Sequence, residues 1–388
     1  MPSSSTDTTP QPAPVLPDYG GACLSGLVRA LCRRREDPVG WLPASVPGAD
    51  QVVVLVVDGL GWEQLRARVA IAPVLNGADG ADRPITSVAP TTTACALTAI
   101  TTGRTPAEHG LIGYRLGTPD ERILNVLRWT VGTAGPVDAR RTVPPASYQP
   151  FPPFPDAGGP VPVVSRSEFA GTGFTAANLG DSPLHGYKVL SSLVLEVVRL
   201  LDGGTPLVYA YYDGIDKIAH ENGLGDHYDA ELRAVDRVVD DLRAALPPGA
   251  VLVVTADHGQ IDVGPNVELL GPELMDGVRF LSGEGRFRWL HAVPGAAGDL
   301  VEAAEGRYAG TTWVRSRDQL LDEGWFGGAL RPGVVGRLGD VALVPHAPIA
   351  FLDPADTGES GLVARHGSLT RDEMLVPLLA LTSEGDRR

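Results

Sequence analysis

Gln51–Gly61, with the sequence QVVVLVVDGLG, is the stretch that decides the fold. Its uninterrupted apolar run, Val52–Val57, is β-branched apart from one leucine, which is typical of a strand covered on both faces. Leu207–Tyr212 (LVYAYY) and Ala250–Thr255 (AVLVVT) have the same character. We therefore predict three buried strands of one sheet.

Amphipathic segments alternate with these strands. Tyr187–Leu201 and Tyr228–Leu246 place apolar residues three and four positions apart, which predicts helices. Alternating strands and helices favour an α/β fold, with a mostly parallel central sheet and helices on both faces.

The remaining chain is expected to divide around this sheet. Residues 1–17 are rich in Ser, Thr and Pro and are predicted to be a disordered tail. Residues 18–263 and 340–388 are assigned to the sheet domain, which the chain re-enters at Asp340–Val344. Between them, residues 264–339 are predicted to form a small α+β insertion or cap, from short strand and helix patterns at Val278–Phe280, Phe287–Ala292, 298–306 and 311–323.

A second irregular stretch, Gly132–Val164, is rich in proline and includes PFPPFP at Pro150–Pro155. Two readings are open for it: an ordered loop or lid, and a disordered insertion.

Composition excludes several classes of protein. The 388 residues carry a net charge of −15, which argues against a nucleic-acid scaffold. No stretch approaches the ~18–20 apolar residues of a membrane span, and the N-terminus lacks the pattern of a secretory signal. Cys23, Cys32 and Cys95 are read as reduced thiols, so a cytoplasmic protein is expected. The sequence does not indicate an oligomeric state.

Acidic residues and histidines follow the predicted strands. Asp58 follows the first, Asp216 and His220 follow the second, and Asp257 and His258 follow the third. Ligands of open α/β sheets bind beyond the carboxyl ends of the strands, so these side chains are expected to share one edge. His366, in ARHG near the C-terminus, is a further candidate.

Three aspartates and three histidines suit zinc, with manganese as a second choice. Six ligands exceed one tetrahedral zinc site and fit two metals, a common device for displacement at phosphorus. Taken singly, most of these groups also have an ordinary explanation, but the adjacent pair Asp257–His258 does not, because two polar groups leaving an apolar run are costly if buried unpaired. Asp58 suits a turn or helix cap, Asp216 and His220 suit a helix-surface pair, and His366 suits a structural role.

A nucleophile candidate lies in PTTT, Pro90–Thr93, ahead of the helix-forming run Ala94–Thr101. Proline and threonine before such a run indicate a helix N-terminus. A hydroxyl there faces the positive end of the helix dipole and free backbone N–H groups, which stabilise bound phosphoryl oxygens. The alternative is that Thr91, Thr92 and Thr93 only cap the helix.

The order of these motifs resembles that of the alkaline phosphatase superfamily, in its type I phosphodiesterase/nucleotide pyrophosphatase branch. The similar segments are VVVLVVDGLG (52–61), PTTT…TTGRTPAEHG (90–110), YYDGIDKIAHENG (211–223), TADHGQ (255–260) and RHGSLTRDEM (365–374). The resemblance implies an alkaline-phosphatase-like fold, a two-zinc site and a catalytic threonine at a helix N-terminus.

Carried over to this chain, the resemblance gives two ligand sets. One metal would be held by Asp58, Asp257, His258 and the hydroxyl of Thr93. The other would be held by Asp216, His220 and His366.

Thr93 is the implied nucleophile because it lies three residues after Pro90 in the family pattern P-x-x-T, with Thr92 as the alternative. His109 matches a family position that is not a ligand and is expected to be structural.

The chain also departs from the nucleotide pyrophosphatase pattern. Ala94 stands where an aromatic residue would stack a nucleobase, and Ala96 stands where an asparagine would hold a phosphoryl oxygen. Nucleotide specificity therefore does not carry over. Ile123–Trp129 (ILNVLRW) and Phe169–Thr175 (FAGTGFT) look like the branch described only as alkaline phosphatase family proteins, and are expected to line the pocket.

The predicted function is a two-metal phosphohydrolase acting on a small phosphate ester, foremost a phosphodiesterase/nucleotide pyrophosphatase-type enzyme with a phosphothreonine intermediate. The alternatives on the same site are a phosphomonoesterase and a phosphonoacetate-hydrolase-like or mutase-like enzyme. A sulfatase is disfavoured because the site offers threonine and Cys95 is out of register.

Two non-hydrolytic readings also compete. A dinucleotide-binding turn at Asp58–Gly61 lacks the third glycine of that fingerprint. A degenerate metal-free binding module conflicts with the presence of all six ligand residues.

Overall fold

A seven-stranded sheet forms the centre of the computed structural model, which describes residues 11–118, 120–132, 135–356 and 358–383. Its strands run in the order β2 (Pro84–Thr86), β19 (Leu375–Thr382), β10 (Ala250–Thr255), β1 (Gln51–Val57), β9 (Leu207–Tyr212), β7 (Val163–Arg166) and β8 (Leu184–Tyr187). β10, β1, β9, β7 and β8 are parallel, and β19 is antiparallel to both of its neighbours. The predicted mostly parallel α/β fold is confirmed.

The three strands predicted from sequence are adjacent in the middle of this sheet. Val52–Val57 of β1 are almost fully buried, as expected for a strand covered on both faces. β1 pairs with β10 from Gln51 opposite Ala250, and with β9 up to Val57 opposite Tyr212. The carboxyl ends of the three strands therefore lie level with one another.

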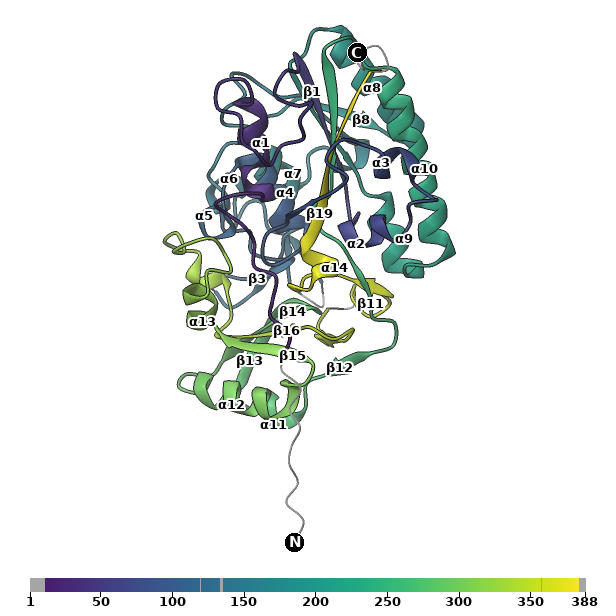
Figure 1. Ribbon diagram of the computed structural model, residues 1–388. Helices are drawn as coiled ribbons and strands as arrows, with labels where there is room; N and C mark the ends of the chain where they lie inside the picture. The colour runs from purple at the N-terminus through teal and green to yellow at the C-terminus, as the bar shows by residue number, and fades with distance from the viewer. Residues whose placement is uncertain (1–10, 119, 133–134, 357, 384–388) are drawn as a thin grey trace.

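Helices cover both faces of the sheet (Figure 1). α1 (Leu24–Cys32), α4 (Thr93–Thr102) and α7 (Gly173–Leu179) form one layer, and α8 (Leu190–Asp202), α9 (Gly214–Asn222) and α10 (Asp226–Ala244) form the other. The α8 helix begins three residues later than predicted, because Tyr187 pairs with Arg166 as the last residue of β8. Short helices α2 (Trp62–Arg66), α3 (Pro73–Asn76), α5 (Pro106–His109) and α14 (Arg371–Met374) complete this part.

A separate lobe is built on a four-stranded antiparallel sheet, at the bottom of Figure 1. Its strand order is β13 (Val278–Glu284), β14 (Phe287–Ala292), β16 (Val341–Pro345) and β15 (Thr312–Ser316). Helices α11 (Pro272–Met275), α12 (Ala297–Tyr308) and α13 (Arg317–Asp322) belong to the same lobe, and a 3-10 turn follows at Val335–Arg337.

The predicted return to the main sheet at Asp340–Val344 is wrong, and so is the boundary at residue 340. Val341–Pro345 pairs with β14 and β15 inside the lobe. A short apolar run fits the interior of either sheet, so periodicity alone does not decide which sheet it joins. The chain rejoins the central sheet only at β19.

Two short strand pairs form the neck of the lobe. β11 (Ile261–Asp262) pairs with β18 (Ala364–Arg365), and β12 (Val267–Leu269) pairs with β17 (Ala350–Leu352). The chain thus enters the lobe just after the TADHGQ segment and leaves it just before His366.

The predicted disordered tail at 1–17 is wrong for its second half, whereas residues 1–10 lie outside the described residues. The Gln11 side chain donates to the carbonyl oxygens of Ala309 and Thr312, and Trp313 Nε1 donates to Pro12 O at 2.7 Å. Val15 N donates to Leu369 O at 2.9 Å. Composition does not reveal these contacts, because they are made with residues some 300 positions away.

The described part of the proline-rich stretch is an ordered loop. Gln149 Nε2 donates to the carbonyl oxygens of Phe151 and Ala177, and Phe154 N donates to Thr101 O at 2.6 Å. The elements in and around it are β3 (Arg115–Gly117), β4 (Ile123–Asn125), β5 (Thr130–Val131), β6 (Val137–Asp138), α6 (Pro145–Tyr148) and a 3-10 turn at Ser167–Phe169. Among the described parts of the chain, no helix has the length and apolarity of a bilayer span.

Arg286 joins the lobe to the central domain. It is fully buried, and its Nε and Nη2 donate to the Glu373 carboxylate at 2.7 and 2.8 Å. Nη1 donates to the carbonyl oxygens of Ala347 and Ile349. Glu373 belongs to α14, directly before β19, so this pair ties the two sheets together.

We predict that Arg286→Ala lowers the free energy of unfolding by about 3–5 kcal/mol, because it leaves Glu373 buried without its counter-ion. Urea unfolding measures the change. Arg371→Ala is the matched control: its partner is Glu63 at 2.9 Å and its side chain is largely exposed, so a loss of at most about 1 kcal/mol is expected. Equal small losses in both variants would contradict the assignment.

Candidate metal centre

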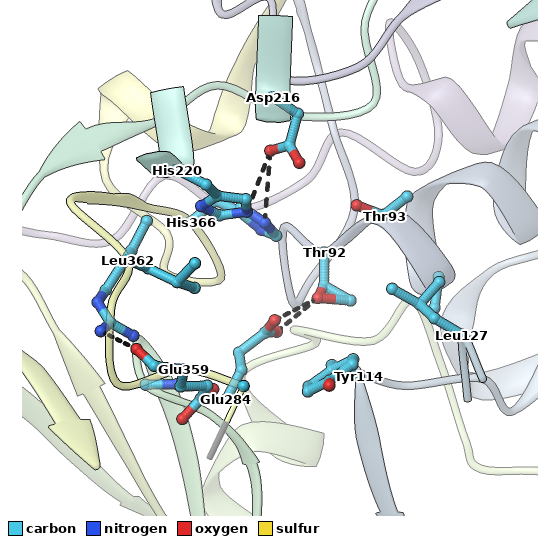
Figure 2. A pocket seen from close by; sticks show the side chains of 14 residues that line it. Thr92, Thr93, Tyr114, Leu127, Asp216, His220, Glu284, Glu359, Leu362 and His366 are labelled. Carbon is cyan, nitrogen blue, oxygen red and sulfur yellow. Dashed lines mark hydrogen bonds and ion pairs between the residues drawn. The ribbon is translucent and has the colours of Figure 1, made fainter. Parts of the chain in front are cut away.

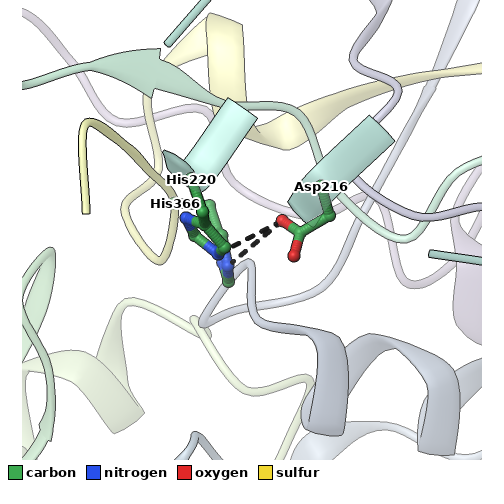
Figure 3. Close-up of side chains that lie close together, drawn as sticks. All are labelled: Asp216, His220 and His366. Atoms are coloured by element: carbon green, nitrogen blue, oxygen red, sulfur yellow. Dashed lines mark ion pairs between the residues drawn. The ribbon is translucent and has the colours of Figure 1, made fainter. Parts of the chain in front are cut away.

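Polar side chains gather at the carboxyl ends of the three central strands. Asp58 directly follows β1, and Asp257 and His258 follow β10. Asp216 and His220 are four residues apart on α9, which begins just after β9, so both lie on one face of that helix. His366 comes from the chain returning through β18 and meets them there (Figure 3).

The structure brings the predicted ligands into one cluster. His220 Nε2 and His366 Nε2 lie 3.3 and 3.8 Å from Asp216 Oδ1. His258 Nε2 lies 3.4 Å from both Asp58 Oδ1 and Asp257 Oδ2.

These atoms form two overlapping groups. The ligand atoms of Asp216, His220 and His366 lie within 4.8 Å of one another, which is one of the predicted sets. Those of Asp58, Asp216 and His258 form a second such group. Asp216 is therefore near both sets, and Asp257 is connected through its contact with His258.

Hydrogen bonds fix the tautomer of all three imidazoles. Each Nδ1 faces a backbone carbonyl oxygen: His220 that of Ala364 at 2.8 Å, His258 that of Gly259 at 3.1 Å, and His366 that of Thr91 at 2.8 Å. A carbonyl oxygen only accepts, so Nδ1 carries the proton. With Nδ1 protonated, each ring turns its Nε2 toward the cluster, the orientation found in metal-ligating histidines.

The electrostatics of the cluster favour a bound cation. Burial lowers the pKa of His258 and His366, so these rings stay neutral at pH 7. Burial raises the pKa of Asp58, and repulsion from Asp257 and Asp216 raises it further. Asp58 Oδ1 and Asp257 Oδ2 have no hydrogen-bond partner among the described residues. Imidazole lone pairs therefore face carboxylate oxygens, an arrangement that fits zinc or a similar divalent ion between them.

Three residues that sequence reasoning missed hold the ligands in place. The Tyr211 hydroxyl donates a short hydrogen bond to Asp58, and Gln260 Nε2 donates to Asp216 Oδ1 at 2.9 Å. Gly59 N donates to Asp257 Oδ1 at 3.1 Å. All three lie inside the quoted motifs, but nothing in their spacing identifies which ligand each contacts.

Gly59 also has a steric role. It adopts a φ of 73°, and a Cβ there would lie 2.3 Å from Gln260 Nε2. The positive φ and the close backbone of Asp216, whose Cα would lie 3.1 Å from that Cβ, explain this glycine, rather than a phosphate-binding turn of dinucleotide-binding proteins.

The two threonines at the start of α4 point to different partners (Figure 2). Thr93 is the first residue of the helix, and its Oγ1 lies 3.2 Å from His258 Nε2. Thr92 is the N-cap residue, but its hydroxyl makes no capping bond. It faces both carboxylate oxygens of Glu284 at 2.6 Å instead. The reading of Thr92 as a side-chain cap is therefore wrong, because a residue of the distant lobe takes its hydrogen bond.

Two cavities meet at Thr93. The first, of about 200 Å³, is lined by polar groups that include Asp216, His220, His366 and Glu284. The second, of about 270 Å³, is lined largely by apolar and aromatic side chains, among them Phe169, Phe174, Tyr209 and Tyr211. Thr93, Leu127 and Asp216 line both. The expectation that segments 123–129 and 169–175 contribute to the pocket is confirmed by Leu127, Phe169, Thr172, Phe174 and Thr175.

His109 lies outside the cluster and has a structural environment. Its Nδ1 accepts from Leu111 N at 3.1 Å, and burial lowers its pKa to about 3. Cys23, Cys32 and Cys95 form no disulfide with one another.

Comparison with known proteins identifies the family. Residues 52–189 and 185–369 match the type I phosphodiesterase / nucleotide pyrophosphatase family. The chain belongs to this family. It is thus a phosphoester hydrolase, and the resemblance to the type I phosphodiesterase/nucleotide pyrophosphatase family that was drawn from its motifs is confirmed.

Solved structures of the same fold accompany this match. Murine ectonucleotide pyrophosphatase / phosphodiesterase 5 is 15% identical, with a TM-score of 0.62 over 86% of this chain and 88% of that one. Phosphonoacetate hydrolase from Sinorhizobium meliloti, solved with phosphonoacetate, is 18% identical, with a TM-score of 0.61 over 88% of this chain and 92% of that one. No curated protein is significantly similar in sequence.

Repulsion within the cluster leads to a prediction for the metal-free protein. The pKa of Asp58 is higher in the folded protein than its value of ~3.9 in the unfolded chain. Protonated Asp58 therefore stabilises the fold fully below pH ~3.9, and this stabilisation is lost as the pH rises through the folded-state pKa. Asparagine mimics the protonated form at every pH. We expect Asp58→Asn to melt at a higher temperature than wild type at pH 7 in chelator.

Added zinc should reverse this order, because wild type keeps the full ligand set. Thermal unfolding with and without zinc measures both effects. A variant that is less stable than wild type at pH 7 in chelator would show that the carboxylates do not oppose one another.

Proposed function

We propose that this chain is a two-metal hydrolase of the phosphodiesterase/nucleotide pyrophosphatase type, with Thr93 as nucleophile. The observation that carries the proposal is the position of the Thr93 hydroxyl. It lies at the N-terminus of α4, 3.2 Å from His258 Nε2, where the two cavities meet. Thr92 is a poorer candidate because its hydroxyl faces Glu284.

The proposed ligand sets are those implied by the family resemblance. Asp58, Asp257, His258 and Thr93 would hold one ion, and Asp216, His220 and His366 the other, with zinc as the first choice and manganese as the second. The ions, when bound, supply positive charge that lowers the pKa of the threonine hydroxyl and neutralises charge on the phosphoryl oxygens.

The chemistry of this chain's own residues then follows in two steps. Thr93 Oγ attacks phosphorus and loses its proton, while the bond from phosphorus to the leaving oxygen breaks and its electron pair stays with that oxygen, which takes up a proton. The N-terminal turn of α4 directs its positive end toward the phosphoryl oxygens. Water then attacks the phosphorus of the phosphothreonine, the bond from phosphorus to Thr93 Oγ1 breaks with its electron pair on that oxygen, and a proton from the water restores the hydroxyl as the phosphate monoester leaves.

The shape of the site favours a diester over a monoester. A phosphodiester carries two organic groups, and Thr93 stands between two cavities, each of which could take one of them. The rings of Phe169, Phe174 and Tyr211 suit an apolar or aromatic group, even though Ala94 offers no ring for stacking. One related structure is an inactive form of the murine protein in complex with AMP, an aromatic ligand.

Substitution of the threonines tests the nucleophile. Thr93→Ala should reduce turnover of bis(p-nitrophenyl) phosphate by several orders of magnitude with little change in metal content, because it removes the attacking oxygen. Thr92→Ala should retain most turnover but cost about 1–3 kcal/mol of stability, because Glu284 loses its hydrogen-bond donor. Kinetics, elemental analysis and urea unfolding separate the two effects. Phosphate trapped on Thr92, or on no threonine during turnover, would refute the assignment.

Metal content tests the ligand sets. Elemental analysis of active protein should find about two zinc ions per chain. Asp216→Asn or His220→Ala should lose metal and most activity while far-UV circular dichroism stays unchanged, because each removes a ligand and no core contact. Glu221→Gln on the same helix is the control, since Glu221 is exposed and lines neither cavity. Full turnover and metal content in Asp216→Asn would make Asp216 and His220 an ordinary helix pair.

A further inference from the structure

The polar cavity has a wall that the reaction above does not use. Glu284 ends β13 in the lobe, and its carboxylate reaches the start of α4, where it meets Thr92 (Figure 2). Tyr114 lines the same cavity, and Asn125 Nδ2 holds its hydroxyl with a hydrogen bond of 2.7 Å. An acidic group and an aromatic ring thus border the space beside Thr93.

Glu284 is buried without a counter-ion. Its side chain is 6% exposed, and no described lysine, arginine or histidine nitrogen lies within 4.0 Å of its carboxylate. Thr92 supplies one hydroxyl proton for two carboxylate oxygens. Burial raises the pKa of Glu284 to about 8. Without a ligand the group therefore keeps its proton at pH 7, and a bound cation would replace that proton and pair with the buried carboxylate.

The neighbouring acid Glu359, in contrast to Glu284, has a counter-ion. Gly285 N donates to its Oε1 at 2.9 Å, and Arg288 Nη2 donates to its Oε2 at 2.5 Å. Its charge is therefore already balanced. Arg365, the cation of this wall, donates through Nη2 to the backbone carbonyl of Glu359. Of these two acids, Glu284 is therefore the one whose carboxyl group is available to pair with a cationic ligand.

The geometry of displacement indicates which part of a substrate meets this wall. Attacking and leaving oxygens lie roughly in line across phosphorus. Thr93 attacks from beside His258, whereas His220 and His366 line the polar cavity and not the apolar one. The leaving group therefore departs toward the polar cavity, and the retained group occupies the apolar one.

We propose that Glu284 selects the leaving group, and that the polar cavity takes an alcohol carrying a positively charged ammonium group. The ammonium group donates to the Glu284 carboxylate and lies against the ring of Tyr114, a favourable cation–π contact. This inference rests on the proposed phosphodiesterase function and adds the class of leaving group.

Three esters that share a retained benzyl group test the inference. Benzyl 2-aminoethyl phosphate carries the ammonium group, benzyl propyl phosphate is its neutral analogue of the same length, and benzyl carboxymethyl phosphate carries an anion. Release of benzyl phosphate reports departure of the second alcohol. We expect wild-type kcat/KM to be highest for the aminoethyl ester.

Glu284→Gln should lower the ratio of kcat/KM for the aminoethyl ester to that for the propyl ester by about tenfold or more, because a charged hydrogen bond is lost. Comparing ratios cancels the intrinsic reactivity of each alcohol. Tyr114→Leu should lower the same ratio and serves as a second variant. Glu168→Gln, which removes an exposed carboxylate next to Phe169 of the apolar cavity, should leave the ratio unchanged.

Each other outcome is decisive. An equal ratio in wild type and both cavity variants would overturn the inference and leave the phosphodiesterase function standing. Preference for the carboxymethyl ester would assign the cavity to Arg365 and overturn it as well. If zinc-loaded protein hydrolysed none of the phosphodiesters, the proposed function would be refuted, and the inference with it.

Discussion

Electrostatic repulsion within one buried cluster is the constraint on which this structure depends. Three carboxyl groups and three imidazoles converge on the same small volume, and Nδ1 of each ring is already hydrogen-bonded to a backbone carbonyl oxygen. Protonation of Asp58 relieves part of the repulsion between the carboxylates, which is why its pKa is raised. The surrounding fold must therefore hold the groups together until a cation does so.

The central sheet supplies that rigidity. β10, β1 and β9 are adjacent, parallel and buried, so the loops that follow them start from fixed positions. Gly59 lets the β1 loop pass against Gln260, and Tyr211 and Gln260 each fix the orientation of one aspartate. These contacts are directional and partly charged, which makes them well suited to hold ligands against their mutual repulsion.

Sequence reasoning succeeded where a signal was local and failed where the deciding contact was remote. Val52–Val57 reads as a buried strand because every residue in it is apolar, and the acids that follow such strands must share an edge of the sheet. Asp340–Val344 was misplaced because its apolar pattern suits either sheet, and its partners in β14 and β15 cannot be read from it.

The N-terminal segment and Thr92 show the same limit. Residues 11–17 have a tail-like composition but bind Trp313 and Leu369, which are distant in sequence. Thr92 resembles a helix cap in every local respect, yet Glu284 lies 192 positions away and takes its hydrogen bond. Glu284 itself stands in no motif, so only the packing of the lobe against α4 reveals its position beside the candidate site.

The neck of the lobe has a consequence for how such a protein can diversify. Residues 267–352 leave the central domain and return to it through two neighbouring strand pairs. The metal-ligand candidates lie outside that span. Glu284 lies inside it. Substitutions in the lobe can therefore change which leaving group the site accepts, while the central sheet keeps the nucleophile and the metal-ligand candidates in place. Selectivity and reactivity are thus free to evolve at separate rates.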